Sequence, residues 1–200
     1  MADPKIGYHA GVQKVSLIDP SNADRVGELD NLFKVPIWID VAHHEIHEGD
    51  SFSLYIGDLD AANTEQVQLY FVTPNTAELT HIVVSAYCSG QHVLTITEGI
   101  TYTAGGTAGT ARNRNRNSAN TSSCTLRTGS DGGSDLITYT GGTVIWSETV
   151  GAGRQQGGST RGVQEWILKA NTAYIIEDTN SSGSPAVLDL NAVWYEHTSE

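Results

Sequence analysis

The sequence predicts an all-β protein, an antiparallel β-sandwich of jelly-roll type with an N-terminal arm and a long polar loop insertion at about 99–142. Short apolar runs recur along the chain, and several alternate apolar and polar residues with the period of a strand. Gly, Pro, Asn or Asp bounds each run, as expected at turns. Helical periodicity is nearly absent, whereas a parallel α/β sheet needs amphipathic helices between its strands.

Length and composition favour one folding unit after the arm. All-β sandwiches often reach the 200 residues of this chain as a single domain. The hydrophobic fraction of 38% is modest, but 4 Trp, 8 Tyr and 3 Phe are enough to fill a thin core between two sheets. We therefore predict an N-terminal arm over 1–35 and a single β-sandwich domain over 36–200.

The expected strands begin where the arm ends. Alternation is clearest at Phe52, Leu54 and Ile56, which share one face of a strand. We expect strands over 35–42, 51–57, 66–73, 79–88, 92–98, 143–150, 163–169, 173–178 and 186–197. Because a Trp on a strand buries a large area and needs one hydrogen-bond acceptor, we expect core or interface positions, rather than a sugar-stacking platform, for the tryptophans. These are Trp38, Trp146, Trp166 and Trp194.

The polar insertion is the longest stretch without a strand pattern. Between Gly99 and Gly142 the chain is rich in Gly, Ser, Thr, Asn and Arg. An insertion of this length in a compact domain usually provides a binding surface, or is ordered by a partner. Since ordering a Gly-rich segment costs conformational entropy, a neighbouring subunit is the natural source of stabilisation.

Charge and cysteine content exclude some partners and compartments. The net charge of −12 and the pI near 4.8 repel phosphate backbones, so we expect no nucleic-acid partner. Cys88 and Cys124 have no metal-type spacing, and we predict that both are reduced thiols. The N-terminus lacks the pattern of a secretory signal, and no apolar stretch reaches membrane-spanning length, so we expect synthesis in a cytoplasm and no membrane partner.

The cluster HHEIHE at 43–48 is the only segment that resembles a metal site. In an extended segment, His43, Glu45 and His47 share one face and offer zinc-type ligands. Side chains two apart on one strand converge poorly on a single ion, however, and the helical His-Glu-x-x-His spacing is missed by one residue. We therefore predict no metal and no cofactor, and we place His43 and His47 among the candidate interface residues.

Arginine and asparagine alternate over 112–117. In an extended conformation this alternation places three guanidinium groups on one side and three amides on the other, a pattern suited to forked pairing with carboxylates. The alternative is a solvated loop. The candidate subunit or capsid interface consists of Arg112, Asn113, Arg114, Asn115, Arg116 and Asn117, with Arg154 and Arg161, which flank a second polar stretch.

Catalytic signatures are missing from the sequence. There is no Gly-x-Ser-x-Gly elbow, no Cys/His motif, and GGTAGT lacks the Lys of a phosphate loop. Acidic residues are numerous, and a pair placed for glycoside hydrolysis stays an open alternative, because its distance is set in space. A cupin-like metalloenzyme is a further alternative. We predict that the chain is not an enzyme and has no catalytic residues.

Several segments together resemble a family of tailed-phage head proteins, the decoration or capsid-stabilising proteins. The matching segments, in order, are HHEIHEGDSF (43–52), FVTPNT (71–76), EG (98–99), RNS (116–118), GSTRGVQEWILKANTAYII (158–176) and WYEHT (194–198). The resemblance implies a β-sandwich that assembles, commonly as a homotrimer, on the outer surface of the capsid and bridges subunits of the major capsid protein. It implies a virion protein made in the cytoplasm of a bacterial host, and it brings no catalytic residues.

The function expected from this resemblance is structural: decoration and stabilisation of a phage capsid. The main alternative is a carbohydrate- or receptor-binding module of a head fibre or tail fibre, which would use Trp and Tyr on exposed loops.

Overall fold

The computed structural model describes residues 41–132, 135–151 and 165–198, and the backbone of short strands at 14–15, 27–29, 36–37 and 155–157. The chain divides into two compact units, residues 1–44 and 45–200. In the first unit, β1 (Lys14–Val15), β2 (Gly27–Leu29) and β3 (Pro36–Ile37) form an antiparallel sheet. The predicted arm over 1–35 otherwise lies outside the described residues, so its role stays a prediction.

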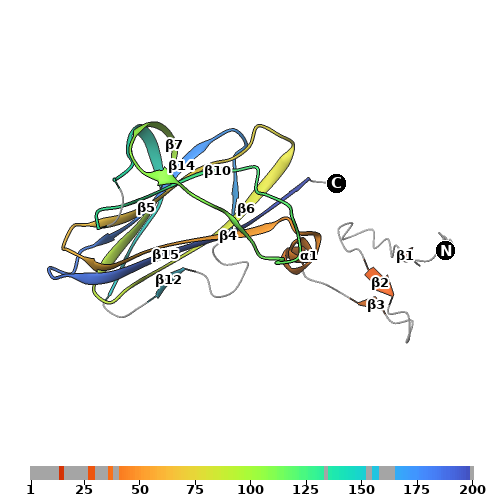
Figure 1. Cartoon of the computed structure of the whole chain (residues 1–200), viewed down its shortest axis with the longest axis horizontal. Coiled ribbons are helices and arrows are strands. Elements are labelled where there is room, and N and C mark those ends of the chain that lie inside the picture. Colours follow the sequence, from red (N-terminus) through yellow and green to blue (C-terminus); the bar gives the residue numbers. More distant parts are fainter. Residues whose placement is uncertain are drawn as a thin grey trace. The chain divides into compact units, whose positions relative to one another are not determined.

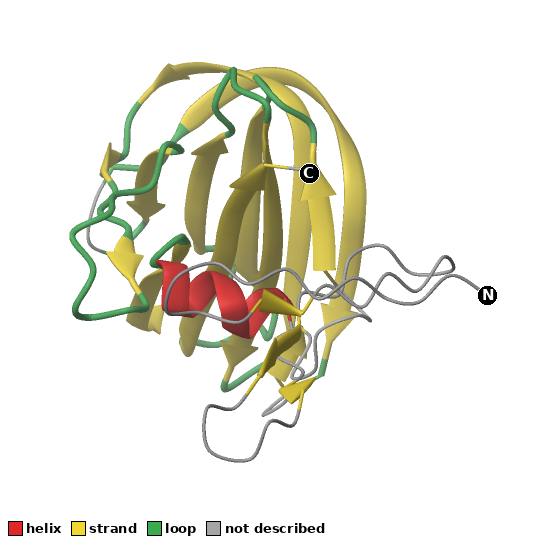
Figure 2. Cartoon of the chain, turned by 90° about the vertical axis from the view of Figure 1, so that its right-hand side faces the viewer, coloured by secondary structure: helices red, strands yellow, loops and turns green. Residues whose placement is uncertain are grey.

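The second unit is a sandwich of two antiparallel sheets (Figures 1 and 2). The first sheet has the order β12 (Gln155–Gly157), β6 (Glu78–Cys88), β15 (Ala186–Thr198), β4 (Ser51–Ala61), β9 (Arg112–Asn113), and β13 (Glu165–Leu168) also pairs with β6. The second sheet has the order β11 (Thr138–Val150), β7 (His92–Ala104), β14 (Ala173–Asn180), β5 (Gln66–Val72), β10 (Thr125–Ser130), β8 (Thr107–Ala108). The predicted antiparallel β-sandwich is therefore confirmed.

The strand order is that of a jelly roll. The main strands in chain order are β4, β5, β6, β7, β11, β13, β14 and β15, and the first pairs with the last, the second with the second-last, and so on inward. This is the pairing of one long hairpin that has been rolled up, so that its paired strands alternate between the two sheets. The topology brings residues from opposite ends of the chain onto neighbouring strands.

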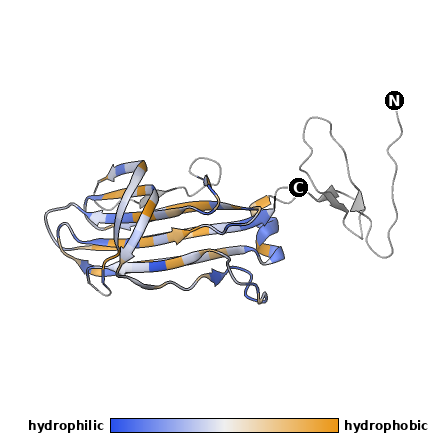
Figure 3. Ribbon diagram, turned by 90° about the horizontal axis from the view of Figure 1, so that it is seen from above, coloured by the Kyte–Doolittle hydropathy of each residue, from blue (hydrophilic) through white to orange (hydrophobic). Residues whose placement is uncertain are grey.

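The core lies between the sheets and follows the period-two pattern of the sequence. Along β15, every second residue from Ala186 to Trp194 is buried, and Figure 3 shows apolar residues distributed along the strands of both layers. The Trp194 ring lies at the centre, with ring centroids 5.2 Å from Phe71 and 5.9 Å from Phe52. Trp146 and Trp166 pack edge to face at 5.7 Å against the same core. The core prediction is thus confirmed for Trp194, whereas Trp146 and Trp166 are half-buried and pack against the core, and Trp38 lies outside the described residues.

The polar insertion between β7 and β11 contains strands of its own. The ends of the predicted loop, 99–104 and 138–142, continue β7 and β11 and pair with each other. Within the remainder, β9 adds to the edge of the first sheet, and β10 and β8 add to the edge of the second. The insertion therefore extends both sheets.

The strand predicted over 35–42 is wrong at its end, because helix α1 (Val41–Glu48) begins at Val41. The helix ends at Gly49, whose φ of +88° is a conformation that glycine adopts at little cost. Hydrogen bonds from Gly49 N to Ile46 O (3.3 Å) and from Asp50 N to Glu45 O (2.9 Å) close the helix in a Schellman motif. A side chain at position 49 would also meet Ser118. The turn residues that punctuate the sequence here end a helix.

α1 has eight residues, and no helix of the described part of the chain is long and apolar enough to cross a membrane.

Candidate interaction surface

The Asn-Arg segment turns after its second residue. Only Arg112 and Asn113 are in a strand, so the extended strip predicted over 112–117 is wrong beyond Asn113. The asparagines themselves cause the turn: Asn113 Oδ1 accepts from Asn115 N (2.8 Å), and Asn115 Oδ1 accepts from Asn117 N (3.1 Å). Side-chain oxygens that bind the backbone two residues on form successive Asx turns. The alternating sequence thus folds back on itself.

Three asparagine amides cap helix α1. The last carbonyls of a helix have no partner within the helix and must be satisfied by other groups. Here the carbonyls of residues 47–49 accept hydrogen bonds from Asn115 Nδ2 (3.0 Å), Asn120 Nδ2 (3.4 Å) and Asn113 Nδ2 (2.6 Å), respectively. We call Asn113, Asn115 and Asn120 the asparagine clamp. It joins the insertion to the helix, so two of the predicted interface residues, Asn113 and Asn115, have a structural role.

The three arginines of the segment are exposed to solvent. Arg112, Arg114 and Arg116 are all exposed, and we call them the guanidinium edge. Arg114 Nη1 donates to Ser51 Oγ on β4 (3.3 Å), and Arg116 Nη1 donates to the carbonyl of Asn113 in the clamp (3.2 Å). Asn113 is buried and Asn115 is half-buried, whereas Asn117 is exposed like the three arginines.

The other predicted site residues are Asn117, His43, His47, Arg154 and Arg161. Asn117, His43 and His47 are exposed, and the carbonyl of His47 accepts from the clamp, whereas Arg154 and Arg161 lie outside the described residues. The grouping of His43, Glu45 and His47 on one extended face is wrong, because these residues are helical and Glu45 is buried while the two histidines are exposed. In the described part of the chain, no group of three or more His, Cys, Asp or Glu side chains has the geometry of a metal site.

A buried carboxylate joins the C-terminal strand to the insertion, and sequence reasoning missed it. The carboxylate of Glu196 accepts hydrogen bonds from Ser123 N (2.9 Å), Trp194 Nε1 (2.9 Å) and the hydroxyls of Ser122 and Ser123. Glu196 N in turn donates to Asp50 O (3.0 Å), next to the end of α1. Four donors satisfy this buried charge, as burial requires. Glu196 and these serines are 73 and 74 positions apart in the chain, so only the fold brings them together.

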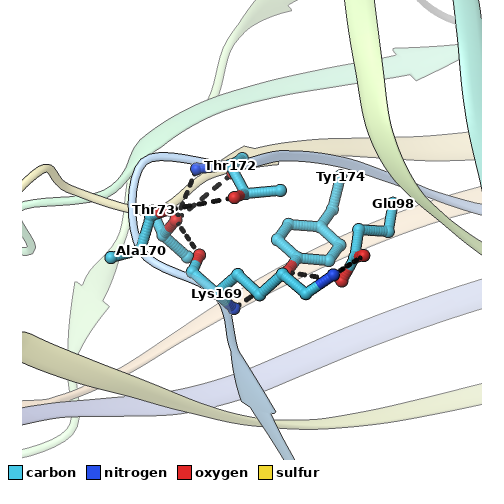
Figure 4. Close-up of polar contacts among 6 residues, drawn as sticks. All are labelled: Thr73, Glu98, Lys169, Ala170, Thr172 and Tyr174. Atoms are coloured by element: carbon cyan, nitrogen blue, oxygen red, sulfur yellow. Dashed lines mark hydrogen bonds and ion pairs between the residues drawn. The ribbon is translucent and has the colours of Figure 1, made fainter.

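A second polar network lies at the turn between β13 and β14 (Figure 4). Lys169 Nζ forms an ion pair with Glu98 Oε1 (2.5 Å), and Tyr174 Oη donates to Glu98 Oε2 (3.0 Å). Thr73 Oγ1 donates to Lys169 O (2.6 Å) and accepts from Thr172 N (3.0 Å). The segments 71–76, 98–99 and 158–176, which were singled out in the sequence, therefore meet through these side chains and hold the turn in place.

Burial and neighbouring charges shift the pKa of several ionisable groups. The ion pair with Lys169 lowers the pKa of Glu98, and burial raises the pKa of Tyr174 to about 12. Cys88 and Cys124 are both free, and burial raises the pKa of each thiol, so neither is present as the reactive thiolate at neutral pH. These pKa shifts follow from burial and from hydrogen bonds and ion pairs within the fold.

The outer face of the second sheet carries a group of aromatic residues. Tyr70, Tyr102 and Tyr139 are half-buried there, and we call them the tyrosine face. The rings of Tyr70 and Tyr102 lie 5.3 Å apart, and the guanidinium of Arg127 lies 5.0 Å from the Tyr102 ring centroid. Tyr139 Oη donates to Glu177 Oε2 (2.9 Å). Because the tyrosines come from three different strands, no local motif identifies the group.

Comparisons with family models, with curated proteins and with solved structures found no match to this chain.

Proposed function

We propose that this chain is a non-catalytic structural protein of a phage virion, which attaches as a homotrimer to the outer capsid surface and bridges subunits of the major capsid protein. The guanidinium edge is the observation that carries the proposal. Three exposed arginines lie within residues 112–116, on a segment that the asparagine clamp holds, in a chain that has 11 Lys and Arg against 23 Asp and Glu. This edge suits a carboxylate-bearing protein partner.

Electrostatics favours such a contact. A chain of net charge −12 repels its own copies at long range, so association needs local contacts of opposite charge. Arginine binds carboxylates through two parallel hydrogen bonds, which gives orientation as well as attraction. Acidic sister chains and acidic capsid loops are both suitable partners, and the asparagine clamp fixes the backbone from which Arg112, Arg114 and Arg116 project. A preorganised edge loses less entropy on binding.

The contacts made by the segments that resemble decoration proteins also support a structural role. The clamp joins the segments 43–52 and 116–118, because Asn115 donates to His47 O and Arg116 donates to Asn113 O. Polar residues of 71–76, 98–99 and 158–176 meet around Lys169. These side chains bind backbone atoms and each other. Their pattern supports a particular fold with broad outer surfaces, and the chemistry of an active site is not needed to explain it.

Stabilisation of a shell then follows from mass action. A protein that binds the intact lattice more tightly than the broken one shifts the equilibrium toward the intact shell. A trimer that contacts several capsid subunits at once raises its effective concentration, so each single contact can be modest.

The test is attachment to heads that lack the protein, measured by co-sedimentation. Replacement of Arg112, Arg114 and Arg116 by Ser should reduce the bound fraction at least about tenfold, because forked pairs with carboxylates are lost. Circular dichroism and thermal melting should show a folded variant, since all three side chains are exposed. The matched control is the triple Lys variant, which keeps charge but not fork geometry and should bind at an intermediate level. Unchanged binding of the Ser variant would refute the role of this edge.

The tyrosine face supports a second candidate function, the binding of glycans as a fibre module. Aromatic rings beside Glu177 and Arg127 offer stacking surfaces together with polar groups. The described tryptophans pack in or against the core, so they do not provide this platform. A glycan array with wild type and Tyr70→Ala distinguishes the candidates: hits that Tyr70→Ala abolishes favour the fibre module.

A further inference from the structure

Two histidines meet on the outer face of the first sheet. His81 is on β6 and His197 is on β15, and these strands pair along their whole length. The two rings lie 4.9 Å apart between centroids, and their Nε2 atoms are 3.1 Å apart. The His81 side chain is 14% exposed, and His197 is half-buried, so both are within reach of a small solute.

An oxygen atom lies beside the Nδ1 atom of each ring, on the side away from the contact between the two Nε2 atoms. His81 Nδ1 lies 3.1 Å from Glu165 Oε1, and His197 Nδ1 lies 3.2 Å from the carbonyl oxygen of Thr198. Both of these oxygens accept hydrogen bonds, so a proton on Nδ1 of each ring would leave both Nε2 atoms unprotonated. A proton on one of the two Nε2 atoms instead gives an N–H···N hydrogen bond between the rings, which the 3.1 Å separation fits. A metal ion between the two nitrogens would take the place of that proton.

The separation suits two ligands of one transition ion. Zinc binds imidazole nitrogen at about 2.0–2.1 Å, and two nitrogens 3.1 Å apart then subtend an angle of about 98° at the ion. This angle lies between those of octahedral and tetrahedral coordination. Neutral imidazole suits zinc, copper, iron and nickel, whereas magnesium and calcium prefer oxygen ligands.

Neighbouring side chains orient the His81 ring as expected for a metal-binding histidine. A carboxylate that accepts the second ring proton of a metal-binding histidine fixes its tautomer and raises its basicity. Glu165 occupies this position. Tyr195 stacks on the His81 ring at 4.6 Å with an interplanar angle of 18°, and its hydroxyl lies 3.0 Å from the same Nδ1. Both neighbours hold the ring in the orientation that directs Nε2 toward His197.

We propose that His81 and His197 bind a divalent transition-metal ion of the zinc type, with Glu165 as the residue that positions His81. Two protein ligands leave the other coordination positions to water or to a donor on a second molecule. This differs from the metal site considered in the sequence, which involved His43 and His47 on α1. It does not depend on attachment to a capsid.

Calorimetric titration of tag-free, full-length protein with ZnCl2 tests the proposal. Wild type should bind about one ion per chain. His197→Ala should weaken that binding about 100-fold or more, because one of two protein ligands is lost. Glu165→Gln should weaken it about 10–100-fold, the usual effect of removing such a partner. The matched control is the triple variant His43→Ala, His44→Ala and His47→Ala, which should bind as wild type does.

Two further measurements separate metal binding from a folding defect and from a shared proton. Thermal melting in EDTA should give similar midpoints for wild type and His197→Ala, whereas ZnCl2 should raise only the wild-type midpoint. Nitrogen NMR of the histidine rings should show that zinc shifts the Nε2 signals of His81 and His197. The proposal is overturned if His197→Ala binds zinc like wild type, if the α1 triple variant loses binding, or if zinc leaves both Nε2 signals unchanged.

Discussion

Replacement of Asn113 tests whether the asparagine clamp holds the insertion to helix α1. The Asn113 amide is buried and makes three hydrogen bonds: Nδ2 donates to Gly49 O (2.6 Å) and Asn120 O (3.0 Å), and Oδ1 accepts from Asn115 N (2.8 Å). Asn113→Ala removes all three. It also leaves the carbonyl of Gly49 without that donor at the end of the helix.

The magnitude follows from the number of bonds. A hydrogen bond contributes about 0.5–1.5 kcal/mol net, and a buried group left unsatisfied costs about 1–3 kcal/mol. Asn113→Ala should therefore lower the free energy of unfolding by about 2–4 kcal/mol. Asn117→Ala is the matched control, since the Asn117 side chain is exposed and makes no hydrogen bond among the described residues, and it should stay within about 0.5 kcal/mol of wild type.

Asn113→Asp separates hydrogen bonding from packing, because it keeps the size and one oxygen of the amide. The new carboxylate would face the two carbonyl oxygens that now accept from Nδ2. At neutral pH it should therefore destabilise at least as much as Asn113→Ala, and protonation in acid should restore part of the loss because the acid can donate. Urea unfolding followed by tryptophan fluorescence measures all four proteins. Equal unfolding free energies for Asn113→Ala and Asn117→Ala would show that the clamp contributes nothing.

Two predictions concern ionisable groups. Asp178 Oδ1 lies 2.6 Å from His92 Nδ1 in the interior, and burial raises the pKa of Asp178 above its value in the unfolded chain. The stability that Asp178 contributes is therefore present at pH values below its unfolded pKa and is lost as the pH rises through its folded pKa. As pH rises from about 3 to 7, the free energy of unfolding of wild type should therefore fall relative to that of Asp178→Asn. A difference between the two proteins that does not change with pH would contradict this. Burial and Glu177 raise the pKa of Tyr139 to about 12. Glu177→Gln should lower the pKa of Tyr139 toward the ordinary value of 10.0, as measured by tyrosinate absorbance against Tyr139→Phe, and an unchanged titration would exclude a contribution from Glu177.

The strands were predictable from the sequence because burial on a strand has a local period. The alternation at Phe52, Leu54 and Ile56 is the alternation of buried positions on β4. The core position of Trp194 follows from the same rule together with its size. These properties depend on a few neighbouring residues, so they appear in the sequence without knowledge of the partner strand.

The helix at 41–48 was not predictable in the same way. His and Glu at polar positions fit a strand edge and a helix surface about equally, and the segment is too short for periodicity to decide. The C-terminus of the helix depends on Gly49 and on side-chain amides more than sixty residues away, such as those of Asn113 and Asn115. The alternation of amides and guanidiniums over 112–117 was visible in the sequence, but the partner of the amides was not.

The sequence by itself determined that this chain forms strands of alternating apolar and polar residues around a core with aromatic side chains. It also determined that a few arginines are clustered in a chain of net negative charge. Only the tertiary structure decided which polar residues meet, because the fold joins residues far apart in the chain. Glu165, His81 and His197 come from three strands, and Glu196 finds Ser122 and Ser123 across 73 or 74 positions. The physical reason is that burial follows a local period of two, whereas a hydrogen bond requires a particular partner at a particular distance.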